Sequence, residues 1–218
     1  MTEPSATNET TPLDAGAFGE WAAELRGALH GERDADVACG ECDACCRSSQ
    51  FVHVAPDEAD TLAHIPAELL FPAPHAPRGH LLLGYDEQGR CPMLRATGCS
   101  IYAHRPRTCR TYDCRVFAAT DVAPDADGNA TKTDIARRAR RWRFTHPAPD
   151  DRARHDAAIT AARYLDERRA ALPDGVVPPV PTQLAVLAVE LHECFLDGPH
   201  PAPDVVTAAV HVTLTRRR

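Results

Sequence analysis

Lysine is almost absent from this chain. Lys132 is the only lysine, so arginine supplies nearly all the positive charge of the 24 basic residues. With 31 acidic residues, the formal net charge is -7. A net negative charge argues against a molecule built as a whole to bind nucleic acid, although a local basic segment could still hold an acidic partner.

Long apolar runs are missing too. The longest clearly apolar stretch covers residues 184–189, which is far too short to span a bilayer. Residues 1–14 contain neither a positively charged segment nor an apolar one, so they do not resemble a secretory signal. We therefore expect a cytoplasmic protein without a membrane partner. In that compartment thiols stay reduced and structural disulfides are not expected.

The remaining composition is that of an ordinary globular protein. Hydrophobic residues make up 44% of the 218 residues and charged residues 25%, which allows a core with a soluble surface. Residues 1–13 are polar and lack periodic apolar positions, so we expect them to be disordered. We expect a cysteine-cluster metal-binding domain with an N-terminal helix over residues 14–120. A helical C-terminal region, residues 121–218, is expected to pack on it.

Apolar spacing predicts several helices. One runs over residues 14–30, with Asp14 as its N-cap and Gly31 at its end. Its apolar face consists of Phe18, Trp21, Leu25 and Leu29. Further helices are predicted over residues 132–144, 151–171 and 182–196. The β-branched segment over residues 205–215 fits either a strand or a helix.

Short strands are predicted around the cysteines. Residues 51–54 form a candidate strand, and residues 80–85 and 90–94 are predicted to form a hairpin around a glycine-containing turn. Three prolines place a loop at residues 71–78, and Pro106 suits the start of a helix. The predicted fold class is α+β, with a small irregular cysteine-rich core that contains a β-hairpin and is flanked by several α-helices.

Nine cysteines need an explanation in a reducing compartment. Four form the pattern C-x2-C-x2-C-C, and four more form C-x7-C-x9-C-x4-C. The first group is Cys39, Cys42, Cys45 and Cys46, and the second is Cys91, Cys99, Cys109 and Cys114. Cys194 stands apart, near Leu191 and Phe195, and is expected to be a core residue.

The spacing of the first group favours a metal or cluster site. Two residues between cysteines let a tight turn direct both sulfurs into one concave space, and Gly40 allows a close approach of the backbone. Bacterial ferredoxins contain the same C-x2-C-x2-C run. Cys46 is expected to point away from Cys45, because adjacent side chains diverge. It could serve a second metal, a bridging role or packing.

The second group supplies further ligands. Soft thiolates select zinc, copper(I) or iron–sulfur clusters, and a fourth ligand would come from the second group. Several arginines lie among these cysteines and could offset the negative charge of the thiolates. They are Arg105, Arg107, Arg110 and Arg115. Reduced cysteines that only pack as small hydrophobes, or a disulfide framework, are the alternatives.

Other cysteine motifs are lacking. A zinc ribbon needs two C-x2-C pairs, and a thioredoxin-like site needs C-x-x-C within a βαβ pattern.

The basic stretch over residues 132–143 is expected to be a solvated helix face. His53 and His64 are assigned to surface or core by default. His104 attracts more interest because it lies between Cys99 and Cys109.

The combined pattern resembles the YkgJ-type cysteine-cluster family, described as a zinc- or iron-chelating domain. The resemblance covers about residues 37–117. The matching elements are Cys39-x2-Cys42-x2-Cys45-Cys46, Cys91-Pro92-x-Leu94, Gly98-Cys99-x-Ile101-Tyr102, Arg105-Pro106-x2-Cys109-Arg110 and Cys114. It implies metal or iron–sulfur binding in a bacterial cytoplasm but no particular reaction. The residues carried over are the eight cysteines, with Tyr102, Arg105, Pro106 and Arg110 as site-supporting residues.

Three functions are compatible with this pattern. The first is a metal-binding protein that holds zinc or an iron–sulfur cluster through clustered thiolates. The second is an iron–sulfur enzyme doing redox chemistry or S-adenosylmethionine-dependent methyl transfer, since flagellin lysine methylases carry a related cluster. This chain is short for that role and lacks the C-x3-C-x2-C spacing of radical enzymes. The third is a thiol-based regulator that releases metal on oxidation.

Overall fold

The computed structural model describes residues 11–33, 35–37, 39–74, 76–126, 128–198 and 201–216. The disorder expected for residues 1–13 therefore falls mostly outside the described residues, and Leu13 already begins the first strand. Within the described ranges, no helix combines the length and the apolar character needed to cross a bilayer.

The chain divides into two compact units. Unit 1 comprises Met1–Glu32, Cys114–Asp127 and Ala136–Arg218, and unit 2 comprises Arg33–Asp113 and Gly128–Ile135. Unit 2 therefore contains the whole first cysteine group and three cysteines of the second.

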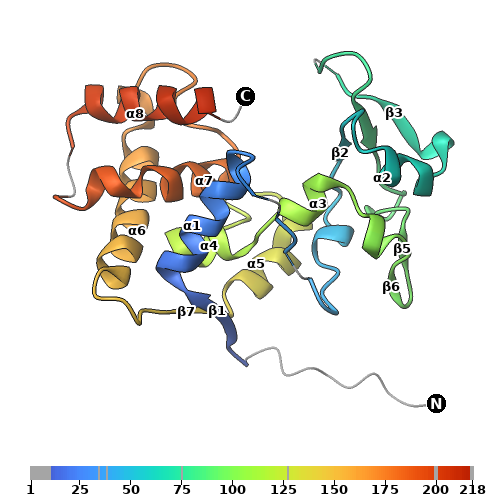
Figure 1. Ribbon diagram of the computed structural model, residues 1–218, viewed down its shortest axis with the longest axis horizontal. Coiled ribbons are helices and arrows are strands. Elements are labelled where there is room, and N and C mark those ends of the chain that lie inside the picture. Colours follow the sequence, from blue (N-terminus) through green and yellow to red (C-terminus); the bar gives the residue numbers. More distant parts are fainter. Residues whose placement is uncertain are drawn as a thin grey trace. The chain divides into compact units, whose positions relative to one another are not determined.

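Unit 1 is mainly helical. Its helices are α1 (Phe18–Leu29), α4 (Arg115–Thr120), α6 (Asp151–Glu167), α7 (Pro181–Leu191), α8 (Pro203–Arg216) and the short η5 (Arg169–Ala171) and η6 (His192–Phe195). Two strands, β1 (Leu13–Ala17) and β7 (Trp142–Thr145), pair in parallel and lie side by side in Figure 1. Helix α5 (Thr133–Ala139) runs across the residues at which the chain changes unit.

This strand pair corrects two helix predictions. The helix expected over residues 14–30 begins only at Phe18, with Ala17 rather than Asp14 as its N-cap residue. Asp14 instead accepts a hydrogen bond from the backbone N–H of Gly16 within the strand segment, at 2.8 Å. The helix expected over residues 132–144 ends at Ala139, because residues 142–145 alternate between half-buried and exposed side chains as a strand does.

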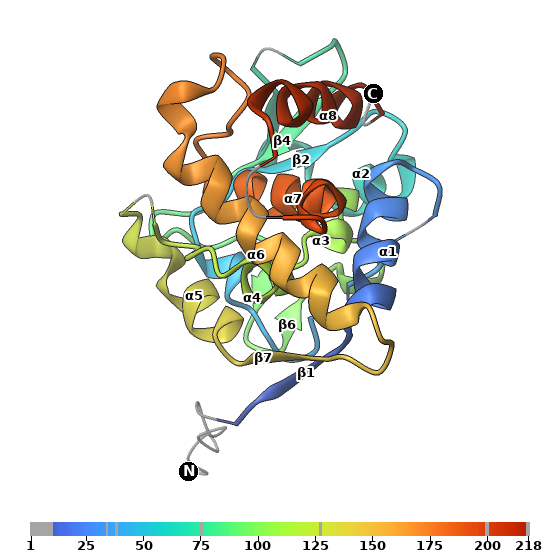
Figure 2. The same ribbon diagram turned by 90° about the vertical axis from the view of Figure 1, so that its left-hand side faces the viewer.

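The core of unit 1 forms where α6 packs on α7 and α4, and Figure 2 shows α6 crossing in front of α7. Small residues of α6 such as Ala161 allow the close approach, and Leu165 and Leu187 are essentially inaccessible to solvent. The helices predicted over residues 151–171 and 182–196 are confirmed. The segment over residues 205–215 belongs to a helix, and Val206 and Val210 of α8 join the same core.

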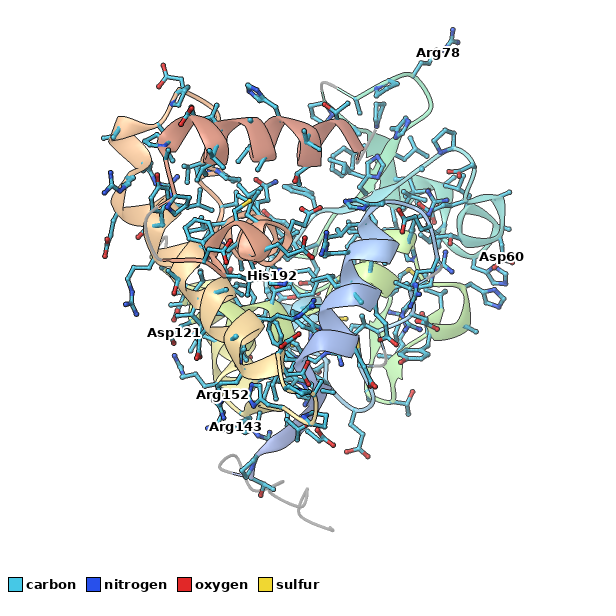
Figure 3. All side chains as sticks on the ribbon, turned by 60° about the vertical axis from the view of Figure 1, so that its left-hand side comes forward. Asp60, Arg78, Asp121, Arg143, Arg152 and His192 are labelled. Carbon is cyan, nitrogen blue, oxygen red and sulfur yellow. The ribbon has the colours of Figure 1, made fainter. Side chains whose placement is uncertain are left out.

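One buried and one half-buried histidine make the stability of unit 1 sensitive to acid. His192 is 1% exposed, its Nδ1 lies 2.6 Å from the Val189 carbonyl oxygen, and Figure 3 shows it among the helices. Burial lowers the pKa of His192, with Glu193 acting against the shift and Arg26 adding to it. Burial also lowers the pKa of His155, whose ring stacks on Phe18.

Unit 1 is therefore expected to be most stable above the pKa of an unfolded histidine, about 6.5, and to lose stability as the pH falls below it. Below that pH the histidines of the unfolded chain bind protons more readily than His192 and His155 do in the folded unit. Thermal melts between pH 7.5 and pH 5 measure this, and His192→Gln should flatten the acid side of the profile. Parallel profiles for the variant and the parent would contradict the assignment to His192.

Unit 2 is built from short elements. Its strands are β2 (Val52–Val54), β3 (Leu70–Pro72), β4 (Leu81–Leu83), β5 (Leu94–Arg95) and β6 (Gly98–Cys99), and its helices are α2 (Ala59–His64), α3 (Arg107–Thr111), η1 (Cys45–Arg47), η2 (Ala67–Leu69), η3 (Tyr102–His104) and η4 (Ala130–Lys132). One antiparallel sheet has the order β2-β4-β3, and β5 pairs with β6 in a second. The α+β class is confirmed.

The hairpin lies elsewhere than predicted. The segment over residues 80–85 does not pair with residues 90–94, because β4 pairs with β2 and β3 on its two sides. The tight hairpin joins β5 and β6 instead, with Leu94 opposite Cys99. The loop predicted at residues 71–78 begins two residues late, since Phe71 and Pro72 belong to the edge strand β3. Proline is tolerated on an edge strand because one side of the strand needs no ladder bonds.

The apolar core of unit 2 is small. Its buried members are Val54, Ile65, Leu83, Met93 and Ile101, and Cys91 and Cys99 pack against them. Small domains with small cores often contain a metal or a crosslink in addition. The structure places two of the cysteines at the edge of this apolar cluster.

Candidate metal centre

One cavity of about 520 Å³ in unit 2 gathers the cysteines. Seven of the eight cysteines expected from the sequence as ligands line it: Cys39, Cys42, Cys45, Cys46, Cys91, Cys99 and Cys109. Cys39 and Cys42 lie in a loop, and Cys45 and Cys46 lie in η1. Cys91 comes shortly before β5, Cys99 belongs to β6 and Cys109 belongs to α3. Sequence segments up to 70 residues apart thus direct their thiols into one space.

A tight turn arranges the first group. The backbone N–H of Cys42 donates to the carbonyl oxygen of Cys39 at 3.1 Å, and Gly40 between them has φ +58°. This left-handed conformation is easily adopted by glycine and costs other residues energy. The C-G-x-C sequence therefore folds back on itself, and the chain continues into η1, which carries Cys45 and Cys46.

Backbone hydrogen bonds join the two cysteine groups. The N–H of Cys91 donates to the carbonyl oxygen of Cys46 at 2.7 Å, and the N–H of Ser49 donates to that of Gly89 at 2.9 Å. Gly89 has φ +75°, and a Cβ there would lie 2.3 Å from the hydroxyl of Ser49. The two segments run so close together because position 89 has no side chain.

A buried carboxylate fixes the helix that carries Cys109. Glu58 accepts a hydrogen bond from the N–H of Ala55 at 2.8 Å and one from the N–H of Arg107 at 2.5 Å. Arg107 is the first residue of α3, so Glu58 caps that helix from a distant part of the sequence. Sequence reasoning missed this residue, because nothing in the local pattern connects position 58 with position 107.

Several of the seven thiols act on one another electrostatically. Burial, reinforced by the nearby thiols of Cys91, Cys99 and Cys39, raises the pKa of Cys46 to about 12. Burial and the same neighbours together with Cys46 raise the pKa of Cys109 to about 12. Burial also raises the pKa of Cys91, and Cys99 adds to the effect. We call Cys46, Cys91, Cys99 and Cys109, which are connected by these effects, the inner group, and the thiol of Cys39 acts on two of its members.

The inner thiols stay spread apart. Asp60, His64 and His104 are the one trio of potential metal ligands in the described part of the chain whose ligand atoms all lie within 4.8 Å of one another. No three cysteine sulfurs there are therefore that close together. Around a single zinc ion with Zn–S bonds of about 2.3 Å, sulfurs would lie roughly 3.8 Å apart. To hold one zinc ion, three of the sulfurs would therefore have to move closer together.

The donor set fits a soft or borderline metal. Sulfur ligands select zinc, copper(I) and iron–sulfur clusters over magnesium or calcium. Thiols that raise one another's pKa need a nearby cation to become thiolates. Arg105 also lines the cavity, and its buried Nε has no hydrogen-bond partner among the described residues. A metal-bound sulfur would give that N–H an acceptor.

Arg105 also holds the loop that leads into the first cysteine group. Arg105 is 6% exposed, and its guanidinium donates to the carbonyl oxygens of Tyr102 at 2.9 Å and Val37 at 3.1 Å and pairs with Asp36. It also lies over the Tyr102 ring, 3.9 Å from the centroid. Asp36 was not singled out from the sequence, because the contact joins residues 69 positions apart.

The other expected supporting residues contribute in different ways. Tyr102 and Pro106 line the cysteine cavity together with Arg105. Arg110 acts through its backbone, because its carbonyl oxygen accepts a hydrogen bond from Val37 at 2.8 Å. Arg107 pairs with Asp57 on the surface of unit 2. Arg115 belongs to unit 1, where it donates to the carbonyl oxygen of Ala15 at 3.2 Å.

Replacing Arg105 by glutamine is expected to destabilise unit 2 by about 1.5–3 kcal/mol, because charged hydrogen bonds to two backbone carbonyls are lost. Metal affinity should fall about tenfold or more as the loop before Cys39 loosens. Arg107→Gln is the matched control, since its exposed ion pair with Asp57 contributes less than about 1 kcal/mol. Chemical denaturation and competitive chelation measure the two effects. Equal losses in both variants would contradict the role given to Arg105.

The two remaining cysteines belong to unit 1. The indole N–H of Trp142 donates to the sulfur of Cys114 at 3.2 Å. Cys194 is partly buried and packs against the apolar core around α6 and α7, as the sequence predicted. The assignment of Cys114 as a metal ligand stays a prediction.

Comparison with known proteins gives one match. Residues 38–136 match the model of the CxxCxxCC family, which is described as "Putative zinc- or iron-chelating domain". The matched stretch contains all eight cysteines of the two groups and confirms the resemblance inferred from their spacing. Neither curated proteins nor solved structures match this chain.

Proposed function

Because the chain carries a CxxCxxCC-family domain at residues 38–136, we propose that it is a metal-binding protein whose unit 2 holds an iron–sulfur cluster. The proposed ligands are the four inner thiols: Cys46, Cys91, Cys99 and Cys109. One observation carries the proposal: seven thiols line one cavity, and no three sulfurs of the described residues lie within 4.8 Å of one another. A cluster several atoms across holds its thiolates farther apart than one zinc ion does.

The surroundings of the cavity suit an anionic cluster. Four thiolates give the bound group a net negative charge, and the guanidinium of Arg105 in the cavity wall opposes it. Met93 and Ile101 line the same cavity with apolar surface, which limits water around the sulfurs. When bound, such a cluster supplies one-electron redox chemistry, and its potential depends on hydrogen bonds to sulfur and on burial.

Three thiols remain beside the inner group. Cys39, Cys42 and Cys45 line the same cavity and form the C-x2-C-x2-C run. In the proposed function they are spare ligands for an alternative cluster corner or for a second ion. A cytoplasmic location belongs to the same proposal, because a reducing compartment keeps all seven thiols available.

Anaerobic purification followed by elemental analysis and an absorption spectrum of the same sample tests the proposal. Iron and inorganic sulfide in equal amounts, with broad visible absorption that bleaches on reduction, are expected. A colourless protein with stoichiometric zinc would replace the cluster by a zinc–thiolate site. A protein that contains neither metal and has all nine thiols titratable would contradict metal binding altogether.

A second candidate function is an iron–sulfur enzyme. The cavity of about 520 Å³ falls within the range typical of small-molecule sites, so it has room beside a bound group. An enzyme using S-adenosylmethionine should change the electron paramagnetic resonance spectrum of the reduced cluster when this cofactor is added. An unchanged spectrum at saturating cofactor would remove methyl transfer from consideration.

A further inference from the structure

A group of potential metal ligands lies outside the cysteine cavity. Asp60 and His64 belong to α2, and His104 ends η3. Each offers one ligand atom, and these atoms all lie within 4.8 Å of one another. Figure 3 shows Asp60 at the outer side of α2. None of the three lines the cysteine cavity, whereas Tyr102 of the same η3 does.

The three side chains are already oriented toward one another. His104 Nδ1 lies 2.7 Å from one carboxylate oxygen of Asp60, and His64 Nδ1 lies 3.8 Å from the other. The two imidazole rings are parallel within 5°, with centroids 3.6 Å apart. His64 Nδ1 is also 2.8 Å from the backbone carbonyl oxygen of Asp60. Two stacked imidazoles and one carboxylate therefore meet at one point of the surface.

The ligand atoms need only small movements to surround an ion. With metal–ligand distances of about 2.0–2.1 Å, ligand atoms around zinc lie roughly 3.4 Å apart. The side chains of Asp60, His64 and His104 are 70%, 41% and 39% exposed, so they can rotate without disturbing a core. Solvent can also occupy the remaining coordination positions. The carboxylate would offset part of the charge of a divalent ion.

From this arrangement we propose a second metal site, formed by Asp60, His64 and His104, which binds a borderline divalent cation of the Zn²⁺, Co²⁺ or Ni²⁺ class. Imidazole nitrogen with one carboxylate oxygen is a donor set for such ions. The site has three protein ligands and open positions for water. It is independent of the cysteine centre in both donor type and exposure.

The competing explanation is purely structural. The hydrogen bond between His104 and Asp60 and the stacked rings would then serve only to fasten α2 to η3. Asp60→Asn separates the two explanations, because the amide oxygen still accepts a hydrogen bond from His104 while a neutral amide is a much poorer ligand for the cation. His64→Ala removes one imidazole at an exposed helix end. The matched control is His80→Ala, which removes a histidine of the same unit that pairs with His53 instead.

The test adds Co²⁺ to the as-purified protein and follows binding by calorimetry and absorption. One additional Co²⁺ is expected, without a sulfur-to-cobalt charge-transfer band. Its affinity should fall at least about tenfold in Asp60→Asn and in His64→Ala and stay unchanged in His80→Ala. No additional Co²⁺, a sulfur-to-cobalt band, or undiminished binding by Asp60→Asn would each overturn the proposal. Melting curves of the four proteins establish that the variants are folded.

Discussion

Stripping the metal from the cysteine cavity is expected to unfold unit 2 and to leave unit 1 folded. The described strands of unit 2 are two or three residues long, and its apolar cluster around Val54 and Leu83 has five buried members. Structural zinc contributes about 10–16 kcal/mol to small domains, and a cluster held by four thiolates is expected to stabilise the unit on a similar scale. Unit 1 has an extensive core around α6, α7 and α8, so it does not need the metal.

Amide hydrogen exchange before and after anaerobic chelation measures this effect separately in the two units. In the metal-free protein, protection should disappear at Cys91 and Ser49, whose N–H groups join the two cysteine segments. Protection in the middle of α6 and α7 should persist. Retained protection at Cys91 after complete metal removal would show that the centre is not structural.

Replacing Cys109 by alanine is expected to remove most of the bound metal. Cys109 lies at the centre of the inner group, since the thiols of Cys46, Cys91, Cys99 and Cys39 all act on its pKa. Helix α3, which carries it, is fixed by the Glu58 cap. Loss of one of four thiolates leaves an open coordination position and a site that exchanges or loses its metal.

Metal content per protein, measured after gel filtration under reducing conditions, checks this expectation. Cys194→Ala is the matched control, because Cys194 packs in the apolar core of unit 1 and should keep the full complement. Cys42→Ala, which lines the cavity outside the inner group, should retain most of the metal. An unchanged metal content in Cys109→Ala would show that the inner group is assigned wrongly.

The helices with clear apolar periodicity could be predicted from the sequence, whereas the sheet pairings could not. Helix α6 and helix α7 are each long enough for the 3.6-residue period to repeat several times. Strands of two or three residues give no such repeat. The pairing of β1 with β7 joins residues more than 120 positions apart, and no local signal marks it. This explains why residues 14–17 and 142–144 were assigned to helices.

The cysteine spacing alone singled out all seven cysteines that line the cavity. Arg105, Tyr102 and Pro106, which the family resemblance added, line the same cavity, and their role at a metal site stays a prediction. The contributions of Asp36 and Glu58 could not be predicted, because each acts on a residue about 50 to 70 positions away through a side-chain contact. The sequence marks His104 only by its position between two cysteines. Its contact with Asp60 of α2 depends on the packing of η3 against α2, which the sequence does not predict.

X-ray absorption at the metal edge tests the central claim most directly. The measurement is best made on the Asp60→Asn protein, so that the proposed surface site does not contribute. The account predicts iron with sulfur as the only near neighbour, together with iron–iron scattering at short distance. Zinc with four sulfurs at about 2.3 Å would contradict the cluster while keeping the thiolate centre. A first shell of nitrogen and oxygen would contradict the cysteine cavity as the metal site.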